Sequence, residues 1–274
     1  MTSTERIRQK YDEIADRYEN IFFYVADAGQ QLVDYADPER GTRVLDVGAG
    51  RGAVARAALA RGCIVTAIDA SAGMVERLGS DYPEITARQM DAGQLNFADS
   101  SFDLVTAGFV VQVLDNPAAA LAEIRRVLAP AGLVALSLEK QSVGRLQWLH
   151  QLHAEFFQSP DPADTAVDEG TAEEGAVDQD VDYLTDQKLD TLLAEGGFVN
   201  LMKKTVEMPL SLPDPQALWN WLVPQGLTEI LRSIPDDRSA EFRRRFFLGA
   251  EHMHTHGGIV LEFSATLHLA HAPR

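Results

Sequence analysis

One segment near the start of the chain restricts the folds that the chain can adopt. In this segment a hydrophobic strand is followed by closely spaced glycines and then by a helical stretch. The segment reads VLDVGAGRG over residues 44–52. Glycines at such a place let a ligand approach the backbone and permit turns that a Cβ atom would block. Since residues 53–61 have a helical pattern, the segment predicts a strand, loop and helix with a ligand at the turn.

Further along the chain, apolar runs typical of strands alternate with helical patterns. Such alternation indicates a parallel sheet that helices cover on both faces. Residues 4–36 show instead apolar positions three and four apart, as in an amphipathic helix. The predicted strands are 43–47, 63–69, 85–90, 102–108, 132–138, 198–208 and 258–270, and the predicted helices are 53–61, 72–79, 117–128 and 185–195.

Two long interruptions break this alternation late in the chain. Ten acidic residues lie between Asp161 and Asp186, with no lysine or arginine between Arg145 and Lys188. Such a charge run indicates either a solvated loop or a lid over a site. The second interruption, 212–256, has a helical pattern with several aromatic residues and predicts a cap inserted before the last strand. We expect no separate second core.

Net charge and cysteine content narrow the function classes. The 274-residue chain has a formal net charge of −17, which repels nucleic acids and anionic membranes. Cys63 is the single cysteine, so no intramolecular disulfide can form. The longest apolar run, 102–114, is too short to span a membrane, and residues 1–10 do not resemble a secretory signal. We expect a soluble cytoplasmic protein that binds neither nucleic acid nor membrane; a homodimer stays open.

The glycine segment by itself fits two classes of ligand. Gly48, Gly50 and Ala53 match the G-x-G-x-x-A form of a dinucleotide-binding loop. A pyrophosphate, however, prefers helix-end N–H donors without a negative charge nearby, and Asp46 places a carboxylate just before the glycines. That carboxylate favours a ligand with a cationic part.

Four further motifs follow in order. Asp69 ends the second predicted strand, where a carboxylate can accept the hydroxyls of a ribose or cap the next helix. Asp91 and Ala92 follow the third strand, FDLV at 102–105 opens the fourth, and EIRRVLAPAG at 123–132 leads into the fifth. Together with the glycine segment, these motifs resemble those of class I S-adenosylmethionine-dependent methyltransferases.

The resemblance implies a fold and a cofactor. The fold is an α/β, seven-stranded, Rossmann-like and mostly parallel sheet whose last strand is antiparallel, with helices on both faces and, in this chain, helical cap insertions. The cofactor is S-adenosyl-L-methionine, which carries a cationic ammonium and a sulfonium and has no phosphate. By resemblance, the cofactor-binding residues are Tyr11, Tyr18, Asp46, Gly48, Gly50, Asp69, Ala70, Met74, Asp91, Ala92 and Phe109.

The opening stretch narrows the resemblance further. Residues 11–18, YDEIADRY, are similar to the first helix of the ubiquinone/menaquinone-type branch, which acts on small molecules. There the helix closes over the cofactor, although Tyr11 and Tyr18 also fit the apolar stripe of a helix. The resemblance covers 7–139 and implies one methyltransferase domain. Its predicted layout within 1–274 is an N-terminal helical cover at 1–40, a cofactor-binding half at 41–139, an acidic insertion or lid at 140–184 and a helical cap insertion at 212–256.

The acceptor side is less defined. Methyl transfer from a sulfonium is an in-line displacement, so alignment in a dry pocket is the main task and a base is optional. Where many relatives have a histidine or asparagine, this chain has Gln112, which cannot act as a strong base. We expect Gln112, Trp219 and His252 to contact the substrate and assign no catalytic residue. His252, His254 and His256 have a metal-like spacing, but they lack an acid partner, so we expect no metal site.

These features favour a methyltransferase that acts on an O, N or C atom of a small, apolar or aromatic molecule. Three other classes stay open. They are an S-adenosylmethionine-binding enzyme of the same fold that catalyses a cyclisation or decarboxylation, an NAD-dependent oxidoreductase, and a non-catalytic regulator that binds the nucleotide. Asp69 does not separate them, because NAD-binding folds place an acid at the same position.

Overall fold

The computed structural model of the chain describes residues 3–140, 144–157, 184–223, 227–232 and 235–274. They belong to two compact units, of which the first, called here the sheet unit, comprises Met1–Ser142, Leu184–Pro209 and Phe263–Arg274. The second, called the helical unit, comprises Val143–Tyr183 and Leu210–Glu262.

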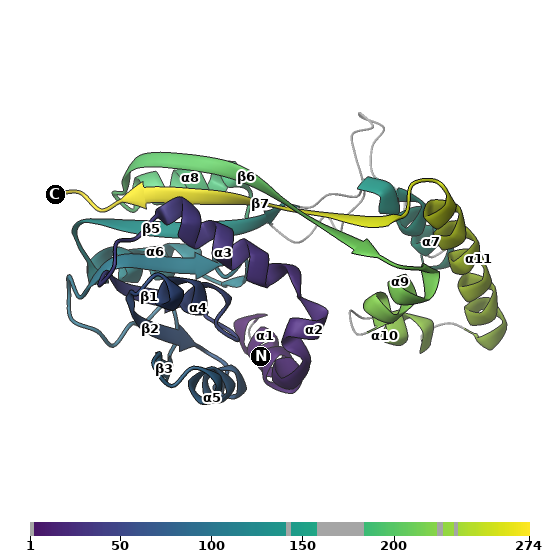
Figure 1. Cartoon of the computed structure of the whole chain (residues 1–274), viewed down its shortest axis with the longest axis horizontal. Helices are drawn as coiled ribbons and strands as arrows, with labels where there is room; N and C mark the ends of the chain where they lie inside the picture. The colour runs from purple at the N-terminus through teal and green to yellow at the C-terminus, as the bar shows by residue number, and fades with distance from the viewer. Residues whose placement is uncertain (1–2, 141–143, 158–183, 224–226, 233–234) are drawn as a thin grey trace, which may run out of the picture. The chain divides into compact units, whose positions relative to one another are not determined.

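Seven strands form one sheet in the order β3-β2-β1-β4-β5-β7-β6 (Figure 1). The neighbouring pairs from β3 to β5 are parallel, whereas β7 runs antiparallel to β5. The predicted mostly parallel sheet with an antiparallel last strand is therefore confirmed. The strands are β1 Arg43–Val47, β2 Ile64–Asp69, β3 Thr86–Gln89, β4 Phe102–Gly108, β5 Leu128–Lys140, β6 Val199–Leu212 and β7 Ile259–His271.

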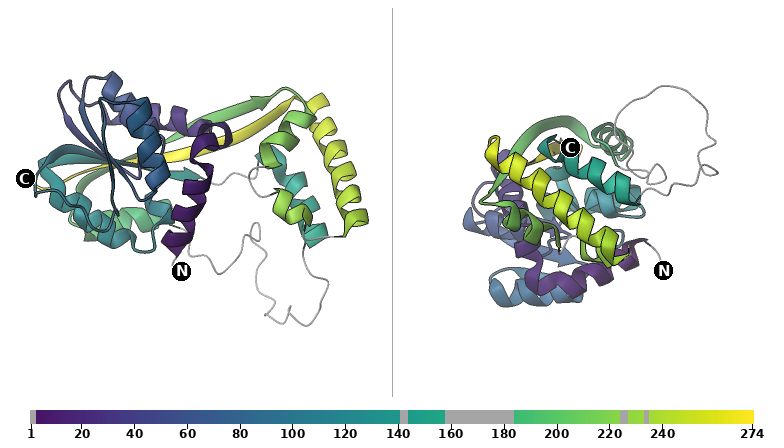
Figure 2. Two further views of the ribbon diagram at one scale, coloured as in Figure 1. Left: turned by 90° about the horizontal axis from the view of Figure 1, so that it is seen from below. Right: turned by 90° about the vertical axis from the view of Figure 1, so that its right-hand side faces the viewer.

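Helices cover both faces of this sheet (Figure 2), because successive residues of each central strand are apolar on opposite sides. Val44 belongs to the buried cluster with the helices α3 and α4, whereas Leu45 belongs to the cluster with α6 and α8. On β4, Leu104 belongs to the first of these clusters and Val105 to the second. The helices of the sheet unit are α1 Ser3–Ile14, η1 Ala15–Arg17, α2 Tyr18–Ile21, α3 Tyr24–Ala36, α4 Ala53–Ala60, α5 Ala72–Asp81, η2 Val111–Val113, α6 Pro117–Val127 and α8 Asp186–Glu195.

Local sequence explains where these helices begin. The side chains of Ser71, Asn116 and Thr185 each accept a hydrogen bond from a backbone N–H of the first turn, in α5, α6 and α8 respectively. Pro117 occupies the first position of α6, where its missing N–H costs nothing. Gly197 follows α8 with a φ of 77°, a conformation that glycine adopts without strain.

The predicted N-terminal helical region is divided into α1, η1, α2 and α3. Helix α3 packs closely on α4 because Gly29 has no side chain at the contact. A Cβ atom at position 29 would lie 2.7 Å from the carbonyl carbon of Ala53, which is too close for any side chain. Gly29 therefore fixes the distance between the two helices.

The helical unit contains η3 Gly144–Leu146, α7 Gln147–Phe157, α9 Pro215–Leu222, α10 Leu227–Arg232 and α11 Asp236–Thr255. Its aromatic side chains pack on one another: the ring of Trp219 lies 5.0 Å from that of Phe246 and 5.5 Å from that of Phe247. Phe242 and Phe246 are fully buried. The expectation of no second core is therefore wrong, because these side chains bury apolar surface within their own unit.

Helix α7 was not foreseen from the sequence, since the predicted acidic insertion 140–184 was interpreted as a loop or lid. Most of the acidic run between 161 and 186 lies outside the described residues. The assignment of 1–274 to one domain with four parts stays a prediction. Among the helices that the structure describes, none is long and apolar enough to cross a membrane.

Candidate functional site

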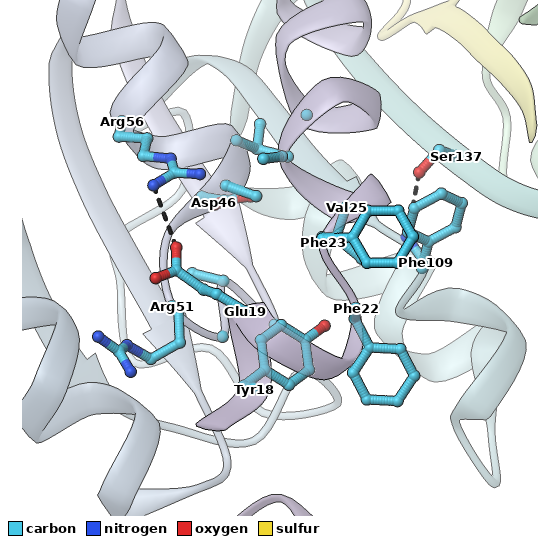
Figure 3. Close-up of a pocket in the computed structure, with 18 residues that line it drawn as sticks. Tyr18, Glu19, Phe22, Phe23, Val25, Asp46, Arg51, Arg56, Phe109 and Ser137 are labelled. Atoms are coloured by element: carbon cyan, nitrogen blue, oxygen red, sulfur yellow. Dashed lines mark hydrogen bonds and ion pairs between the residues drawn. The ribbon is translucent and has the colours of Figure 1, made fainter. Parts of the chain in front are cut away.

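Two adjoining pockets open in the sheet unit, where the carboxyl ends of β1, β2 and β4 meet. We call them the Asp69 pocket and the aromatic pocket, and Figure 3 shows the second. Both are lined by Tyr18, Gly48, Gly50, Gly108 and Phe109. The predicted cofactor residues that line the Asp69 pocket are Tyr11, Tyr18, Gly48, Gly50, Asp69, Ala70, Met74, Asp91, Ala92 and Phe109. The structure thus brings together every predicted cofactor residue except Asp46.

The glycine loop after β1 forms the floor between the pockets. Gly48 and Gly50 have φ values of 63° and 53°, which residues with a side chain rarely adopt. A Cβ atom at Gly48 would lie 2.3 Å from Val110 Cγ2, whereas at Gly50 its nearest neighbour would be Tyr18 Cε1 at 4.0 Å. Gly48 is therefore needed for packing, and the space above Gly50 is open to a ligand.

Asp69 joins this loop to the start of helix α5. Its Oδ2 accepts a hydrogen bond from the backbone N–H of Gly50 at 2.8 Å, and its Oδ1 accepts one from Ser71 at 2.9 Å. Burial raises the pKa of Asp69, and these backbone hydrogen bonds act in the opposite direction. A carboxylate has about four lone-pair sites, so it can still accept hydroxyl donors of a ligand.

Asp46 has a different place from the one its sequence position suggested. The side chain is 1% exposed, with Oδ2 accepting from Ala55 N at 3.0 Å and Oδ1 from Thr106 Oγ1 at 2.8 Å. Burial raises its pKa to about 7. Asp46 lines the aromatic pocket and not the Asp69 pocket. With both oxygens bonded to the protein, this carboxyl holds the loop between β1 and α4.

Helix α1 is tied to the Asp69 pocket through Asp12. Its Oδ1 accepts hydrogen bonds from Ser71 Oγ and from Gly73 N, the latter at 3.1 Å. Tyr11 and Tyr18 then form part of the pocket wall, with ring centroids 5.9 Å apart. Burial is the main cause that raises the pKa of both tyrosines, so their hydroxyls stay protonated.

Aromatic and charged side chains face one another in the second pocket. Figure 3 shows the rings of Tyr18, Phe22, Phe23 and Phe109 on one side and the two arginines, Arg51 and Arg56, on the other. The guanidinium of Arg56 forms an ion pair with Glu19 at 3.1 Å. Arg51 donates to the carbonyl oxygen of Ala15 at 2.8 Å and pairs with Asp81.

Phe109 stands between the two pockets in a strained conformation. Its φ is 59°, which is uncommon for a residue with a side chain. The backbone N–H of Phe109 donates to Ser137, which holds this conformation against β5. Strained residues cluster at functional sites, so the backbone supports Phe109 as a binding residue. The sequence alone gave no sign of this strain.

The predicted substrate residues are not brought together by the contacts that the structure describes. Gln112 lines neither pocket, and its Oε1 accepts a hydrogen bond from Glu139 N at 2.8 Å. Trp219 and His252 belong to the helical unit. Trp219 is buried there, whereas His252 is exposed and its ring stacks on that of His256 at 4.1 Å. Their substrate roles stay predictions. No cluster of metal-ligating side chains occurs within the described part of the chain.

Several pocket residues were missed in the sequence analysis. Met90 directly precedes the predicted Asp91, and Arg51 lies inside the glycine segment, so position alone could have indicated both. Phe22 lies within residues 4–36, whose apolar positions predict an amphipathic helix, and in such a stripe a core role and a pocket role look alike. The other missed lining residues include Arg8, Val113 and Leu114 in the Asp69 pocket and Glu19, Phe23 and Arg56 in the aromatic pocket.

Comparison with known proteins supports the same part of the chain. Residues 45–136 match the family described as methyltransferase domain. The demethylmenaquinone methyltransferase of Renibacterium salmoninarum is 34% identical over 139 residues, which cover 48% of this chain and 58% of that protein. Aklanonic acid methyltransferase DauC of a Streptomyces species is 32% identical over 143 residues, with 48% and 64% covered. The matched region spans less than two thirds of either curated relative.

Solved structures share the fold. The YcgJ protein of Bacillus subtilis matches with a TM-score of 0.56 and 17% identity, over 90% of this chain and 99% of that one. The cyclase SpnF matches with a TM-score of 0.53 and 17% identity, over 90% and 80%. The predicted Rossmann-like fold is thereby confirmed. The resemblance of this chain to the S-adenosylmethionine-dependent methyltransferases, first indicated by its ordered motifs, is confirmed by the match over residues 45–136.

Proposed function

We propose that this protein is an S-adenosylmethionine-dependent methyltransferase that transfers a methyl group to an O, N or C atom of a small, apolar or aromatic molecule. The observation that carries the choice of cofactor is the hydrogen bond from Ala55 N to Asp46. Ala55 lies in the first turn of α4, where backbone N–H groups would bind the pyrophosphate of a dinucleotide. Asp46 takes that donor and adds a carboxyl group, which disfavours a phosphate.

The residues of the Asp69 pocket fit S-adenosylmethionine. The open space above Gly50 admits a ligand against the loop, and Asp69 can accept both hydroxyls of a ribose at the end of β2. Asp91, Tyr11 and Tyr18 line the same pocket, where Asp91 would bind the adenine amino group and the two tyrosines would contact the methionine end. The cofactor would supply an electrophilic methyl group on a sulfonium. The chain's own part is to align the acceptor and to exclude water.

Calorimetry on the purified protein tests the cofactor. We expect micromolar binding of S-adenosylmethionine and of S-adenosylhomocysteine, and no comparable binding of NAD or NADP. Tight binding of NAD together with no heat from either sulfur nucleotide would replace the proposal by an oxidoreductase.

A single substitution tests the place of the ribose. Asp69→Ala is expected to weaken S-adenosylhomocysteine binding by about 2–3 kcal/mol, the scale of hydrogen bonds to a charged group. Asp27→Ala is the matched control, because Asp27 is exposed on α3 and lines neither pocket. Equal affinity of the two folded variants would show that the ribose binds elsewhere.

The acceptor side of the proposal concerns the aromatic pocket and the two insertions. Its wall of Tyr18, Phe22, Phe23 and Phe109 suits a planar, apolar acceptor. We also propose that 140–184 and 212–256 cover the acceptor, because long insertions in a compact fold are usually functional or disordered. Hydrogen exchange with cofactor and acceptor bound should then slow in both segments. Protection confined to 44–112 would exclude this covering role.

A labelled methyl group separates the proposal from its main alternative. The cyclase SpnF shares the fold, and an enzyme that uses the cofactor only as an electrostatic element would bind it without consuming it. Transfer of label from S-adenosylmethionine to any member of a panel of hydroxylated aromatic compounds supports a methyltransferase. Product formation without label transfer supports the alternative. A cytoplasmic location, no binding of nucleic acid and a possible homodimeric state belong to the same proposal and are open to fractionation and light scattering.

A further inference from the structure

A glutamate and a buried tyrosine meet at the carboxyl end of β5, next to the aromatic pocket. Tyr24 Oη donates a hydrogen bond to Glu139 Oε1 across 3.2 Å. Glu139 follows Ser137 by two residues on β5, and Ser137 lines the aromatic pocket. Residues two apart on a strand share one face, so Glu139 extends the same wall toward the edge where ligands bind in such sheets.

The tyrosine is held rigidly by aromatic neighbours. Its ring stacks on that of Phe263, with centroids 4.4 Å apart and planes inclined by 9°. It also meets the edge of Phe109, the residue shared by both pockets, at 6.2 Å. With 8% of its surface exposed, Tyr24 has little freedom to turn away. The hydroxyl therefore gives the carboxylate of Glu139 a defined orientation.

The backbone of Glu139 is fixed from the other side. Gln112, in η2, accepts the hydrogen bond of Glu139 N at 2.8 Å. Glu139 Oε1 accepts from Tyr24, while Oε2 accepts no hydrogen bond from the residues that the structure describes. The side chain is exposed at the sheet edge. One carboxylate oxygen is thus oriented and still available to a ligand.

The surroundings favour a basic carboxylate. Loss of solvation raises the pKa of Glu139, while the hydrogen bond from Tyr24 lowers it. The charge of Glu139 also contributes to the raised pKa of Tyr11 and Tyr18, together with that of Asp69. The charge of Glu139 therefore influences the hydroxyls of two tyrosines that line the pockets.

The two acids that line the aromatic pocket are already engaged. Asp46 has both oxygens bonded to the protein, and Glu19 forms an ion pair with Arg56. Neither has the free, oriented oxygen that Glu139 presents. Gln112, predicted to meet the substrate, anchors Glu139 through its Oε1.

We propose that Glu139, which lies beyond the lining of the aromatic pocket at the end of β5, is a catalytic base that accepts the proton of an acceptor hydroxyl, and that Tyr24 is its positioning residue. This inference rests on the proposed methyltransferase function and names an acceptor class, phenols and enols. Such a hydroxyl is a poor nucleophile until its proton is removed, which a positioned carboxylate can do. Its aromatic or conjugated body fits the wall of Phe22, Phe23 and Phe109.

The step balances in atoms and charge. The O–H bond of the acceptor breaks, its proton binds Glu139 Oε2, and its electron pair forms the new bond to the methyl carbon while the carbon–sulfur bond breaks toward sulfur. The carboxylate becomes neutral as the sulfonium becomes a thioether. Because Glu139 is exposed, it can return the proton to solvent after the reaction.

The probe for this inference is 4-nitrophenol, whose ionised form absorbs visible light. The protein is saturated with S-adenosylhomocysteine, so no methyl transfer occurs, and binding of the probe is measured across the pH range in which its hydroxyl ionises. An ionised Glu139 accepts a hydrogen bond from the neutral phenol and repels the phenolate. We expect the neutral form to bind about tenfold more tightly, the equivalent of one pKa unit.

Three variants give this expectation its contrast. Glu139→Gln should abolish the preference for the neutral phenol while retaining the affinity for S-adenosylhomocysteine. Tyr24→Phe should also bind the neutral phenol more tightly than the phenolate. On acidification this variant should lose the preference at a higher pH than the wild type does, because removal of the hydroxyl donor raises the pKa of Glu139. Glu207→Gln is the matched control, an exposed glutamate on β6, and should behave as the wild type.

Activity adds a second readout for any phenol that is methylated. Loss of a general base lowers kcat by about 10²–10⁴-fold. Glu139→Gln should show this loss with little change in KM and without the acidic limb of the pH profile. Glu139→Asp should recover part of the rate, because the shorter side chain retains the carboxylate.

Two outcomes would overturn the inference. One is the same preference for the neutral phenol in Glu139→Gln as in the wild type. The other is no binding of 4-nitrophenol to a wild-type protein that binds S-adenosylhomocysteine normally. Failure of S-adenosylhomocysteine itself to bind would instead refute the proposed function, so the two failures are distinguishable.

Discussion

The interiors of the two units differ in what they bury. All buried polar or charged residues of the described chain lie in the sheet unit, and they are Asp46, Ser71, Thr106, Ser137, Thr266 and His268. The described interior of the helical unit is apolar, with Phe242 and Phe246 at its centre. Burial of a polar group costs free energy unless hydrogen bonds replace its water. The sheet unit bears this cost at six residues, whereas the described part of the helical unit adds the buried indole N–H of Trp148.

The polar interior of the sheet unit serves two purposes. Asp46, Ser71 and Ser137 lie beside the pockets and fix the glycine loop, helix α5 and Phe109. His268 instead fastens α8 to β7, with Nε2 at 3.1 Å from Asp186 Oδ1 and Nδ1 at 3.2 Å from Asp190 Oδ1. The two pockets and the buried polar residues beside them thus belong to the sheet unit, while the described core of the helical unit consists mainly of apolar side chains.

The largest expected effect tests whether the two units are energetically separate. Phe246→Ala removes a fully buried ring from the helical unit and should lower the free energy of unfolding by about 3–5 kcal/mol. Denaturant unfolding measures this loss, and calorimetry should show unchanged affinity for S-adenosylhomocysteine. Leu248→Ala, at an exposed position of α11, is the control. A parallel loss of cofactor affinity would mean that the pockets depend on the helical unit.

A second effect tests the cost of the buried carboxyl in the sheet unit. The pKa of Asp46 is about 7 in the folded chain and 3.8 when it is unperturbed, so the folded state binds its proton more tightly. Stability from this group is present at low pH and is lost as pH rises from about 4 to about 7. Relative to wild type, Asp46→Asn should therefore become more stable with rising pH, by up to about 4 kcal/mol.

Thermal and denaturant unfolding at several pH values measure that difference. Asp27→Asn provides the control, since Asp27 is exposed on α3 and should give a constant difference. If the difference in unfolding free energy between Asp46→Asn and the wild type also stayed constant with pH, Asp46 would be ionised and well solvated in the folded protein. The two interiors would then differ less than their buried residues suggest.

The smallest expected effect concerns a hydrogen bond at the surface of the sheet unit. Gln112→Leu removes the acceptor of Glu139 N and should lower stability by about 0.5–1.5 kcal/mol, because water can reach the freed donor. Gln112→Glu keeps an acceptor at the same position and should lose less. Equal losses in both variants would assign the effect to packing of η2 and not to the hydrogen bond.

The sheet unit could be predicted from the periodicity of apolar residues and from local motifs. The glycine segment and the alternation of apolar runs indicated β1, β2 and β4 closely, because those strands are buried on both faces and bounded by turn residues. Helix α7 was missed because it lies beside an acidic run that suggested a loop. The second core was missed because a helical pattern does not reveal whether Trp219 packs within its own unit or against another.

The site was predictable only as far as its residues form a motif. Asp69, Gly48 and Gly50 are adjacent in sequence to the strands that position them, so their place in the pocket followed from the glycine segment. Tyr24 and Glu139 are 115 residues apart, and only the folded sheet brings them together. The hydrogen bond from Thr106 to Asp46 could not be predicted either, since it depends on the pairing of β1 with β4.

The absence of a side chain at Gly29 has a consequence for anyone who would redesign the aromatic pocket of this protein. Position 29 cannot be varied, because any substituent would separate α3 from α4 and shift the aromatic residues that the start of α3 carries. Phe22 and Phe23 precede that helix and line the aromatic pocket, where their rings also contact Tyr24. A mutagenesis library at these two positions therefore changes the shape of the wall without altering the contact between α3 and α4. The chain thus separates a position that packing closes to variation from positions at which the wall of the pocket can be varied.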